Sequence, residues 1–394
     1  MNKKSYILFL PKWYPCRNMP LSGIFIQRHA KAVSSLTDVA VLYAVYDEKL
    51  KGKWIEEQEE TEDGVWTLRY YYRKTFTGLG FLDKPLKLFL YFLCLHKGYS
   101  RIVKQIGRPA LIHVHVLLRT GIFAYSKSLF SNIPYIISEH WSGYLKECNA
   151  YRGTLRKKLS GFIVRKSSLL TTVSEALKQA MQSRGLQNRT MIIPNVVDTN
   201  KFFCQAVQEK KKIRILYIAD LIEEVKNISA VLRVVKRLSE QRTGFEFVLI
   251  GDGKDKPVYK EYCRKNELLD KIVFMKGYVQ PVFIPTYLCE SDFLVLFSHF
   301  ETQGTVLLEA MSCGKPVLAA GTGGMKELVN ESNGMLIQPG SEEDLLDKMN
   351  FMMDHFQTYK AEAIRKFVTD RFSEKVVAKQ FYDVYTSVRN LTEK

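Results

Sequence analysis

Short apolar runs alternate with polar loops and amphipathic segments along the whole chain. In the first half, runs with the length of buried strands lie at 6–10, 39–45, 110–116, 135–138 and 169–173. In the second half, similar runs lie at 213–218, 246–250, 272–274, 293–298 and 316–320. Because segments at helical spacing separate many of these runs, the pattern predicts an α/β protein built from parallel βαβ units.

The clearest of these units is residues 293–320, FLVLFSHFETQGTVLLEAMSCGKPVLAA. Gly304 stands where the loop becomes a helix, so the backbone N–H groups of Gly304, Thr305 and Val306 can approach an anion such as a diphosphate. Glu301 and Glu309 flank this turn, and two carboxylates beside a phosphate would repel it unless they bind something else. Sugar hydroxyls are the obvious partners, so the unit predicts a nucleotide-sugar site.

Glu301-x7-Glu309, with Gly314-Lys315-Pro316-Val317 after it, resembles the signature of the retaining glycosyltransferases of family four. The resemblance implies the GT-B fold, in which two Rossmann-like parallel-sheet domains face a central cleft. Residues 1–200 would then form an acceptor-binding domain and residues 201–371 a nucleotide-sugar-binding domain. Residues 372–394 would form a helix that crosses back to the first domain.

The same resemblance assigns roles to residues outside the central unit. Gly23 matches the glycine that lets the first helix approach the donor phosphates, and His140 matches the active-site histidine beside the donor sugar. Asn195 lies in a segment similar to the Pro-Asn-Gly-Val-Asp element at the domain hinge. Val279 matches a position whose backbone meets the nucleobase.

Two cations of the family bind the donor diphosphate, and the chain departs from this pattern. Lys226 matches the family lysine, but Asp220 occupies the place of the family arginine. Since an aspartate repels a diphosphate, either Lys226 carries the cationic role alone or another basic residue substitutes.

Several elements are predicted from local pattern alone. Residues 49–63 are polar and strongly charged, and we interpret them as an excursion from the sheet. The alternating stretch 65–72 predicts an edge strand, 333–336 a short hairpin, and 372–388 an amphipathic helix. The apolar stretch 81–95 is too short to span a bilayer, and it predicts a helix packed on the domain or lying at a lipid surface.

Composition and cysteine use are those of a globular protein in a reducing compartment. The chain has 394 residues, 46% of them hydrophobic and 25% charged, which predicts two to three domains. Its seven cysteines are scattered and include no Cys-x-x-Cys pair. A disulfide framework or a zinc site is therefore not expected. With neither a signal peptide nor a spanning segment in the sequence, we expect a cytoplasmic protein, with peripheral binding at the inner face of the membrane as an option.

The positive charge is concentrated in one half. Residues 1–200 contain 30 Lys and Arg against 14 Asp and Glu, whereas residues 201–394 contain 28 against 27. A basic half predicts an anionic partner: an acidic membrane surface, a phosphorylated acceptor or nucleic acid.

Together with the resemblance, which implies retention of the anomeric configuration, these features predict a metal-independent transferase without a cofactor, which moves a hexose-type sugar from a UDP- or GDP-sugar to a glycan or lipid-linked acceptor. Surface-polysaccharide assembly is the expected context. Glu309 would bind the ribose hydroxyls and Glu301 the sugar hydroxyls, while Lys226 would stabilise the departing diphosphate. The chain has no Asp-x-Asp metal motif.

Three alternatives are weighed against this function. A glycosidase with Glu301 as nucleophile needs a second carboxyl group at a defined distance, and the phosphate-binding turn argues against it. A GT-B sugar-nucleotide epimerase needs further carboxylates in the first-domain cleft, and none is clearly placed. A nucleic-acid-binding protein would leave the nucleotide-sugar turn unexplained, and the basic half lacks the aromatic and basic interleaving of a known module.

Overall fold

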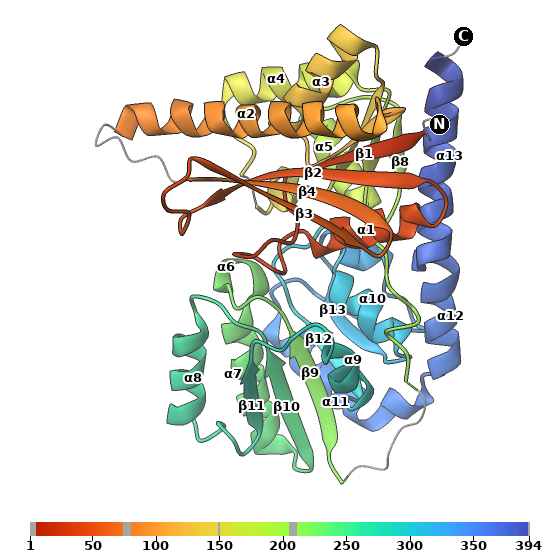
Figure 1. Cartoon of the computed structure of the whole chain (residues 1–394). Coiled ribbons are helices and arrows are strands. Elements are labelled where there is room, and N and C mark those ends of the chain that lie inside the picture. The colour runs from red at the N-terminus through yellow and green to blue at the C-terminus, as the bar shows by residue number, and fades with distance from the viewer. Residues whose placement is uncertain (1–4, 74–79, 149, 205–210, 393–394) are drawn as a thin grey trace.

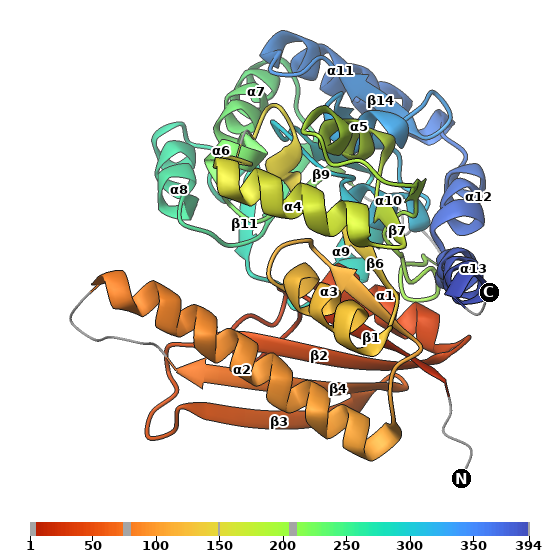
Figure 2. The same cartoon turned by 90° about the horizontal axis from the view of Figure 1, so that it is seen from above.

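The computed structural model describes residues 5–73, 80–148, 150–204 and 211–392, which form two α/β units, each built on one sheet (Figures 1 and 2). The first sheet has eight strands in the order β3-β4-β2-β1-β5-β6-β7-β8, and the second has six in the order β11-β10-β9-β12-β13-β14. All neighbouring strands are parallel except β3 and β4. This arrangement confirms the predicted fold class of two Rossmann-like parallel-sheet domains.

The strands of the first sheet are β1 (Tyr6–Pro11), β2 (Asp38–Asp47), β3 (Ile55–Glu62), β4 (Val65–Arg73), β5 (Leu111–His115), β6 (Tyr135–Glu139), β7 (Leu169–Thr172) and β8 (Thr190–Ile192). Those of the second are β9 (Ile213–Ile218), β10 (Phe245–Ile250), β11 (Val273–Gly277), β12 (Phe293–Leu296), β13 (Val317–Ala320) and β14 (Gly334–Ile337).

The helices that alternate with the first sheet are α1 (Ile24–Ser34), α2 (Gly80–Ile106), α3 (Thr120–Ser131), α4 (Thr154–Lys166) and α5 (Glu175–Ser183). Those that follow are α6 (Glu223–Lys226), α7 (Ile228–Gln241), α8 (Lys256–Lys265), α9 (Ile284–Cys289), α10 (Thr305–Ser312), α11 (Glu342–His355), α12 (Ala361–Phe372) and α13 (Glu374–Thr392). Three short 3₁₀ turns are η1 (Ser142–Tyr144), η2 (Gly323–Glu327) and η3 (Phe356–Thr358).

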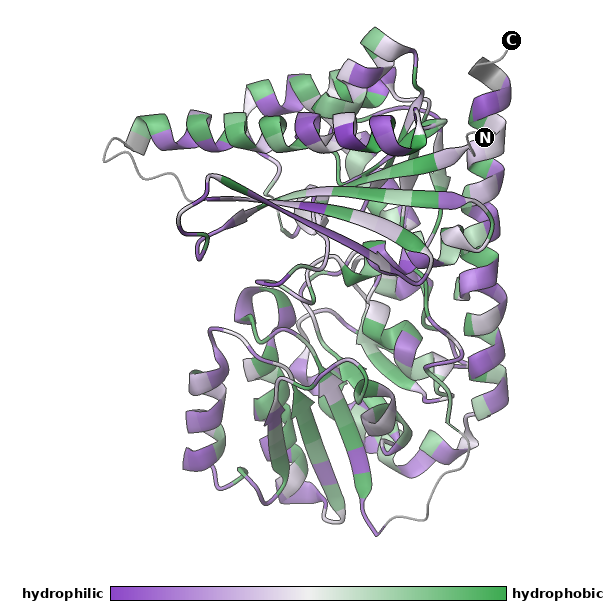
Figure 3. Ribbon diagram, viewed as in Figure 1, coloured by the Kyte–Doolittle hydropathy of each residue, from purple (hydrophilic) through white to green (hydrophobic). Residues whose placement is uncertain are grey.

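The edge of the first sheet differs from the prediction. The polar excursion at 49–63 contains β3, which pairs antiparallel with β4. Stretch 65–72 is therefore not the edge, because β4 lies between β3 and β2. In β3 most side chains are exposed and glutamates dominate, so it lacks the apolar signal of a strand (Figure 3). It is held by its pairing with β4 and by ion pairs such as the one between Arg69 and Glu60.

Helix α2 begins where the apolar stretch was noted and continues to Ile106. It lies across β2 and β4 (Figure 2), with Leu90, Tyr91, Cys94 and Leu95 buried. Its first turns instead expose apolar side chains, so one helix serves both as core and as surface. Within the described ranges, no helix combines the length and apolar character required to cross a bilayer.

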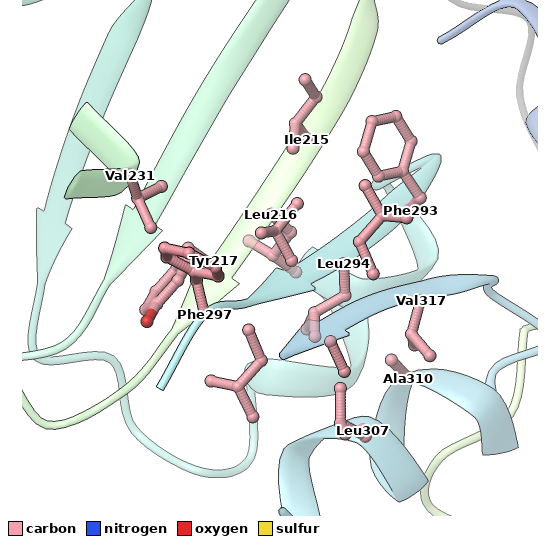
Figure 4. Packing of buried hydrophobic residues seen from close by; sticks show 14 of the residues in the cluster. Ile215, Leu216, Tyr217, Val231, Phe293, Leu294, Phe297, Leu307, Ala310 and Val317 are labelled. Carbon is pink, nitrogen blue, oxygen red and sulfur yellow. The ribbon is translucent and has the colours of Figure 1, made fainter. Parts of the chain in front are cut away.

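The core of the second sheet surrounds the central βαβ unit. Phe293 and Leu294 of β12 pack beside Ile215 and Leu216 of β9, and Leu307 of α10 closes over β12 and β13 (Figure 4). The predicted strand, loop, helix and strand of this unit are confirmed. The expected hairpin at 333–336 is wrong: β14 pairs parallel with β13 as the last strand of the sheet.

Helix α13 returns to the first domain and packs on α1 (Figure 1). Its Val377, Phe381 and Tyr385 are buried, and the Tyr385 hydroxyl lies 2.8 Å from Nδ1 of His113 on β5. The predicted domain boundaries at residues 200 and 371 stay predictions.

The expectation that the cysteines stay unpaired is wrong for one pair. Cys204, in the connection between the two sheets, forms a disulfide with Cys289 at the end of α9. The two residues are 85 positions apart, and the fold alone brings them together. Cys313 completes a cluster whose sulfur atoms all lie within 4.8 Å of one another.

Candidate active site

A cleft of about 480 Å³ lies between the two sheets. Much of its lining follows the carboxyl ends of strands, where open α/β sheets bind ligands. Nine of the ten predicted site residues line it: His140, Asn195, Lys226, Val279, Glu301, Gly304, Thr305, Val306 and Glu309. The structure therefore brings these predicted residues together. The tenth, Gly23, is not part of the lining, although Leu21 and Ile24 are.

The turn at the start of α10 has the geometry of an anion site. Gly304 has φ of 82°, a left-handed conformation that glycine adopts without steric cost. A Cβ there would lie 3.2 Å from side-chain atoms of Leu307 and Met325. The helix begins at Thr305, and Gly304, Thr305 and Val306 line the cleft. The N–H groups of a first helical turn have no partner within the helix and favour negative charge.

Glu301 is ion-paired within the second domain. Its carboxylate contacts the ammonium group of Lys226, the last residue of α6, and accepts a hydrogen bond from Ser298 Oγ at 3.3 Å. The Lys226 and Glu301 side chains are 18% and 17% exposed. Two residues predicted to bind different parts of a donor thus form an ion pair with each other.

Glu309 is ion-paired across the cleft. Nη1 of Arg28, on α1, lies 2.7 Å from Oε1 of Glu309, and both side chains are largely buried. Arg28 lines the cleft but was missed by sequence reasoning. One signal in the sequence could have found it. Arg28 lies five residues after Gly23, on the helix that was predicted to approach the donor phosphates.

Asp220 lies in the cleft lining, as does Asp252, which is paired with Lys256 at 3.1 Å. With Glu301 and Glu309, the lining has four carboxylates among its described residues and two fixed cations, Arg28 and Lys226. The cleft is therefore acidic before any ligand binds.

His140 follows β6 and belongs to a group of buried histidines. Its Nε2 lies 3.3 Å from Nδ1 of His115 on β5, and its ring centroid is 5.6 Å from that of His29 on α1. Burial lowers the pKa of His140 well below its usual value, and the neighbouring His29 lowers it further, whereas the Asn195 side chain opposes the shift. His140 is therefore a neutral imidazole at physiological pH.

The loop that carries His140 is fixed by the fully buried Glu139. The Glu139 carboxylate accepts hydrogen bonds from the backbone N–H groups of Leu117 at 3.0 Å, His140 at 2.9 Å and Trp141 at 3.0 Å. Burial raises the pKa of this carboxyl, and the three N–H groups oppose the shift. Glu139 is thus a positioning residue for the histidine.

Nitrogen atoms of His29, His115 and His140 all lie within 4.8 Å of one another, a spacing that three metal ligands can adopt. In this structure His29 Nε2 lies 3.1 Å from the Pro194 carbonyl oxygen, and His115 and His140 bond to each other. These contacts use one ring nitrogen of each histidine, whereas His29 Nδ1, His115 Nε2 and His140 Nδ1 are buried without a hydrogen-bond partner among the described residues.

Gly23 caps α1 with φ of 69°. A Cβ at this position would lie 2.3 Å from the carbonyl oxygen of Trp13, so only glycine permits this approach of the loop after β1. Gly23 itself is not part of the lining, whereas Leu21 and Ile24 on either side of it are.

Asn195 and Val279, the remaining predicted residues, also line the cleft. The backbone N–H of Asn195 donates to Oε1 of Gln303 at 2.8 Å, which ties the segment after β8 to the loop before α10. Val279 follows β11 beside the half-exposed Tyr278, and both line the cleft. A flat base at this end would meet an aromatic ring and backbone groups.

Comparison with known families agrees with this geometry. Residues 198–367 match the model of the glycosyl transferases group 1, and residues 58–201 match that of glycosyltransferase family 4. The two models together cover residues 58–367, and the chain is a glycosyltransferase. The two matches together run from β3 to α12 and contain every predicted site residue except Gly23.

Two relatives of this glycosyltransferase illustrate the similarity in sequence. An uncharacterized 41.2 kDa protein in the cps region of Klebsiella pneumoniae is 27% identical over 180 residues, or 45% of this chain and 48% of that protein. The chain thus spans about half the length of this relative. A protein provisionally named as the teichuronic acid biosynthesis glycosyltransferase TuaC of Bacillus subtilis is 23% identical over 414 residues, or 97% of this chain and 98% of that one.

A solved structure shares the fold. Anabaena HepE, in complex with UDP and glucose, superposes with a TM-score of 0.71 at 18% identity, over 97% of this chain and 99% of that one. At this identity the likeness extends to the GT-B architecture alone.

Proposed function

We propose that this protein is a retaining, metal-independent hexosyltransferase that uses a UDP- or GDP-sugar and acts in surface-polysaccharide biosynthesis. In the reaction, the bond from the anomeric carbon to the diphosphate oxygen breaks, and its electron pair leaves with the diphosphate. A new bond forms to an acceptor hydroxyl, whose proton passes to an oxygen of the departing diphosphate. The observation that carries the proposal is the start of α10, where the amide turn lies between Glu301 and Glu309 in one cleft.

The donor would lie along this turn. The amides of Gly304, Thr305 and Val306 would bind the phosphates, and Glu309 would bind the ribose hydroxyls. The base would lie against Val279 and the adjoining backbone. HepE, with UDP and glucose bound in the same architecture, supports a nucleoside diphosphate as the donor's leaving group.

The sugar would lie between the two domains. Glu301 would bind its hydroxyls, and Lys226, which contacts Glu301, would stabilise the negative charge that develops on the departing diphosphate. Neutral His140 would lie beside the reacting carbon, where an uncharged imidazole can accept or donate one hydrogen bond. Asn195 would hold the hinge next to it.

A thermal-shift panel tests the donor site. Wild type and Glu309→Ala are heated with UDP, GDP and their sugars in the presence of a chelator. A ligand that binds only the folded state raises the unfolding midpoint, so we expect a shift with one base series that is lost in Glu309→Ala. Glu331→Ala, at an exposed glutamate of the same domain, is the matched control and should keep the shift.

Two outcomes would contradict the proposal. One is the absence of a shift with every nucleotide in wild type. The other is a shift that appears only when a divalent metal ion is added in place of the chelator, which would overturn metal independence. Binding to random DNA with steep salt dependence, without nucleotide binding, would instead favour the nucleic-acid function.

We further propose that the acceptor is lipid-linked and that the first domain binds the anionic inner face of a membrane. On the first turns of α2, one side exposes Phe81, Leu82, Leu88 and Phe89, with Phe81 73% and Phe89 61% exposed. The adjoining later turns present His96, Lys97, Arg101 and Lys104. Apolar side chains beside basic ones are what an interfacial helix requires.

Vesicle co-sedimentation tests this surface. We expect binding to phosphatidylglycerol vesicles but not to phosphatidylcholine vesicles, and weakening by salt. Replacing both Phe81 and Phe89 by Ser should weaken binding by about tenfold or more, because two large apolar side chains no longer enter the lipid. Val258→Ser, at an exposed apolar residue of the second domain, is the control. Equal sedimentation with both lipids would contradict the proposal.

A further inference from the structure

The charge of the cleft does not suit a diphosphate as it stands. Among the described residues that line it, Asp220, Asp252, Glu301 and Glu309 are acidic and only Arg28 and Lys226 are fixed cations. Both cations are already paired with the two glutamates. A donor that carries about two negative charges would enter a site whose positive charge is occupied.

The second domain alone supplies one of the two cations. Among the described lining residues of the second domain, Lys226 is the only basic one. Asp220, which follows β9, places a carboxylate where a second cation could bind the diphosphate. The remaining cation, Arg28, comes from the first domain. Any nucleotide held by the second domain therefore meets Arg28 from across the cleft.

Arg28 is positioned for this contact. It stands five residues after the cap glycine of α1, and Glu309 stands five residues after the cap glycine of α10, so the two helices present their charges to each other. The guanidinium Nη1 lies 2.7 Å from Glu309 Oε1, and the Arg28 side chain is 15% exposed. Its guanidinium carbon lies 5.6 Å from the ring centroid of Phe202, another residue of the cleft wall.

A simple exchange of partners resolves the charge conflict. Glu309 lies about 7 Å along α10 from the amides at the start of the helix, at 1.5 Å per residue. That distance is within the reach of an arginine side chain that turns from the glutamate toward a bound phosphate. Glu309 would then be free for ribose hydroxyls, and the planar guanidinium would bind two phosphate oxygens at once.

We propose that Arg28 is a diphosphate-binding residue: in the empty enzyme it neutralises Glu309, and when a donor binds it moves to the diphosphate. The inference rests on the proposed donor site, which it deepens. Because Arg28 belongs to the first domain and the nucleotide to the second, donor binding would also hold the two domains together. The opposing account is a latch, in which Arg28 pairs with Glu309 only to hold the domains and never contacts the donor.

Nucleotides of different phosphate number distinguish the two accounts. UDP, UMP and uridine, and the guanosine series in parallel, are titrated calorimetrically onto wild type, Arg28→Gln, Arg28→Lys and Glu309→Ala. If Arg28 binds the diphosphate, Arg28→Gln should weaken diphosphate binding by about tenfold or more, the loss of a charge-assisted contact. Uridine binding should stay unchanged or improve, because Glu309 is released. Arg28→Lys should lie between the two, since lysine keeps the charge without the fork.

The latch predicts the opposite sign. Breaking it would free Glu309 for every nucleotide, so UDP and uridine would bind equally well or better in Arg28→Gln, and that result overturns the inference. Lys31→Gln is the matched control: Lys31 is also on α1 and pairs with Asp198 and Glu374, but it lies outside the cleft lining. Its UDP affinity should equal that of wild type. Unfolding midpoints of all variants establish that each one is folded.

A compensating change sharpens the test. Asp220→Arg, introduced into Arg28→Gln, removes a carboxylate and adds a guanidinium on the opposite wall of the cleft. We expect it to restore part of the lost UDP affinity, and a double variant that binds UDP no better than Arg28→Gln would overturn the role given to Asp220. A wild type that binds no nucleotide would instead refute the proposed function, so the two failures are distinguishable.

Discussion

Helices α1 and α10 begin in the same way and present different chemistry to the cleft. Each follows a glycine in the left-handed conformation, with φ of 69° at Gly23 and 82° at Gly304. Around Gly23, loop atoms crowd the glycine and the residues that face the cleft are apolar, such as Ile24 and Phe25. At α10 the turn itself lines the cleft. The comparison indicates that, of two glycine-capped helices beside one cleft, the one whose cap glycine itself lines the cleft is the better candidate for an anion site.

The two ion pairs of the cleft differ in the domains that they connect. The pair of Lys226 and Glu301 lies within the second domain, whereas that of Arg28 and Glu309 joins the two domains. The first is expected to act on the chemical step, because both partners would surround the breaking bond. The second is expected to act on donor binding.

The largest effect is therefore expected from Lys226→Ala. Removal of the ammonium group should lower kcat by about 100-fold or more, since charge on the departing diphosphate loses its stabilisation. The unfolding midpoint should also fall, because removing one partner of a largely buried ion pair leaves the Glu301 carboxylate without its counterion, so the measured midpoint must show that the variant is folded at the assay temperature. Steady-state kinetics with the donor found in the thermal-shift panel measures the effect. Lys254→Ala, at an exposed ion pair of the same domain, is the control, and turnover close to wild type in Lys226→Ala would refute the assignment.

Alanine at the two cap glycines should separate their roles. In Gly23→Ala the new Cβ would meet the Trp13 carbonyl at 2.3 Å, whereas in Gly304→Ala it would meet side-chain atoms at 3.2 Å. We expect Gly23→Ala to lower the free energy of unfolding by about 3 kcal/mol, and Gly304→Ala by about 1 to 2 kcal/mol. UDP affinity should fall more in Gly304→Ala, because the turn proposed to bind phosphate is displaced.

Urea unfolding and UDP titration of both variants measure these quantities. Gly340→Ala, at a left-handed glycine with open space around its Cβ position, gives the cost of the backbone conformation alone. A greater loss of UDP affinity in Gly23→Ala than in Gly304→Ala, with both proteins folded, would reverse the comparison.

The sequence predicted the part of the site that is local in the chain. The β12, loop and α10 unit lies within 28 consecutive residues, and its apolar runs, glycine and glutamates are all visible there. His140, Lys226 and Asn195 were placed through family resemblance, and the cleft lining contains all three. The roles assigned to these residues stay predictions.

Other features depend on contacts between distant segments. Strand β3 has no apolar alternation, because it is the edge strand and most of its side chains are exposed. The sequence of β14 resembles a turn, and only its parallel pairing with β13 shows that it is a strand. The disulfide joins Cys204 to Cys289, 85 residues away. Arg28 is identified as a cleft residue only by its ion pair with Glu309 on the other domain. Sequence pattern reports local periodicity and cannot report such pairings.

The last effect depends on pH and concerns His29, the neighbour of Arg28 on α1. Burial lowers the pKa of His29 to about 4, although its contact with the Pro194 carbonyl opposes the shift. In the unfolded chain this histidine titrates near 6.5, so below that pH the unfolded state binds more protons than the folded one. Stability should therefore be intact above about pH 6.5 and should fall by about 1.4 kcal/mol per pH unit between 6.5 and 4 for this residue.

The buried His113, His115 and His140, whose pKa values are also lowered by burial, add to the loss in the same direction. His29→Gln keeps an N–H donor for the Pro194 carbonyl and removes one titrating group. Between pH 7 and pH 5 we expect the variant to lose about 2 kcal/mol less free energy of unfolding than wild type. Urea titrations at the two pH values measure this difference, and His355→Gln, at an exposed histidine that follows Phe351 by one helical turn, is the control. An unchanged pH dependence in His29→Gln would mean that the His29 imidazole is protonated in the folded protein as readily as in the unfolded chain. The neutral state assigned to the neighbouring His140 would then be wrong as well.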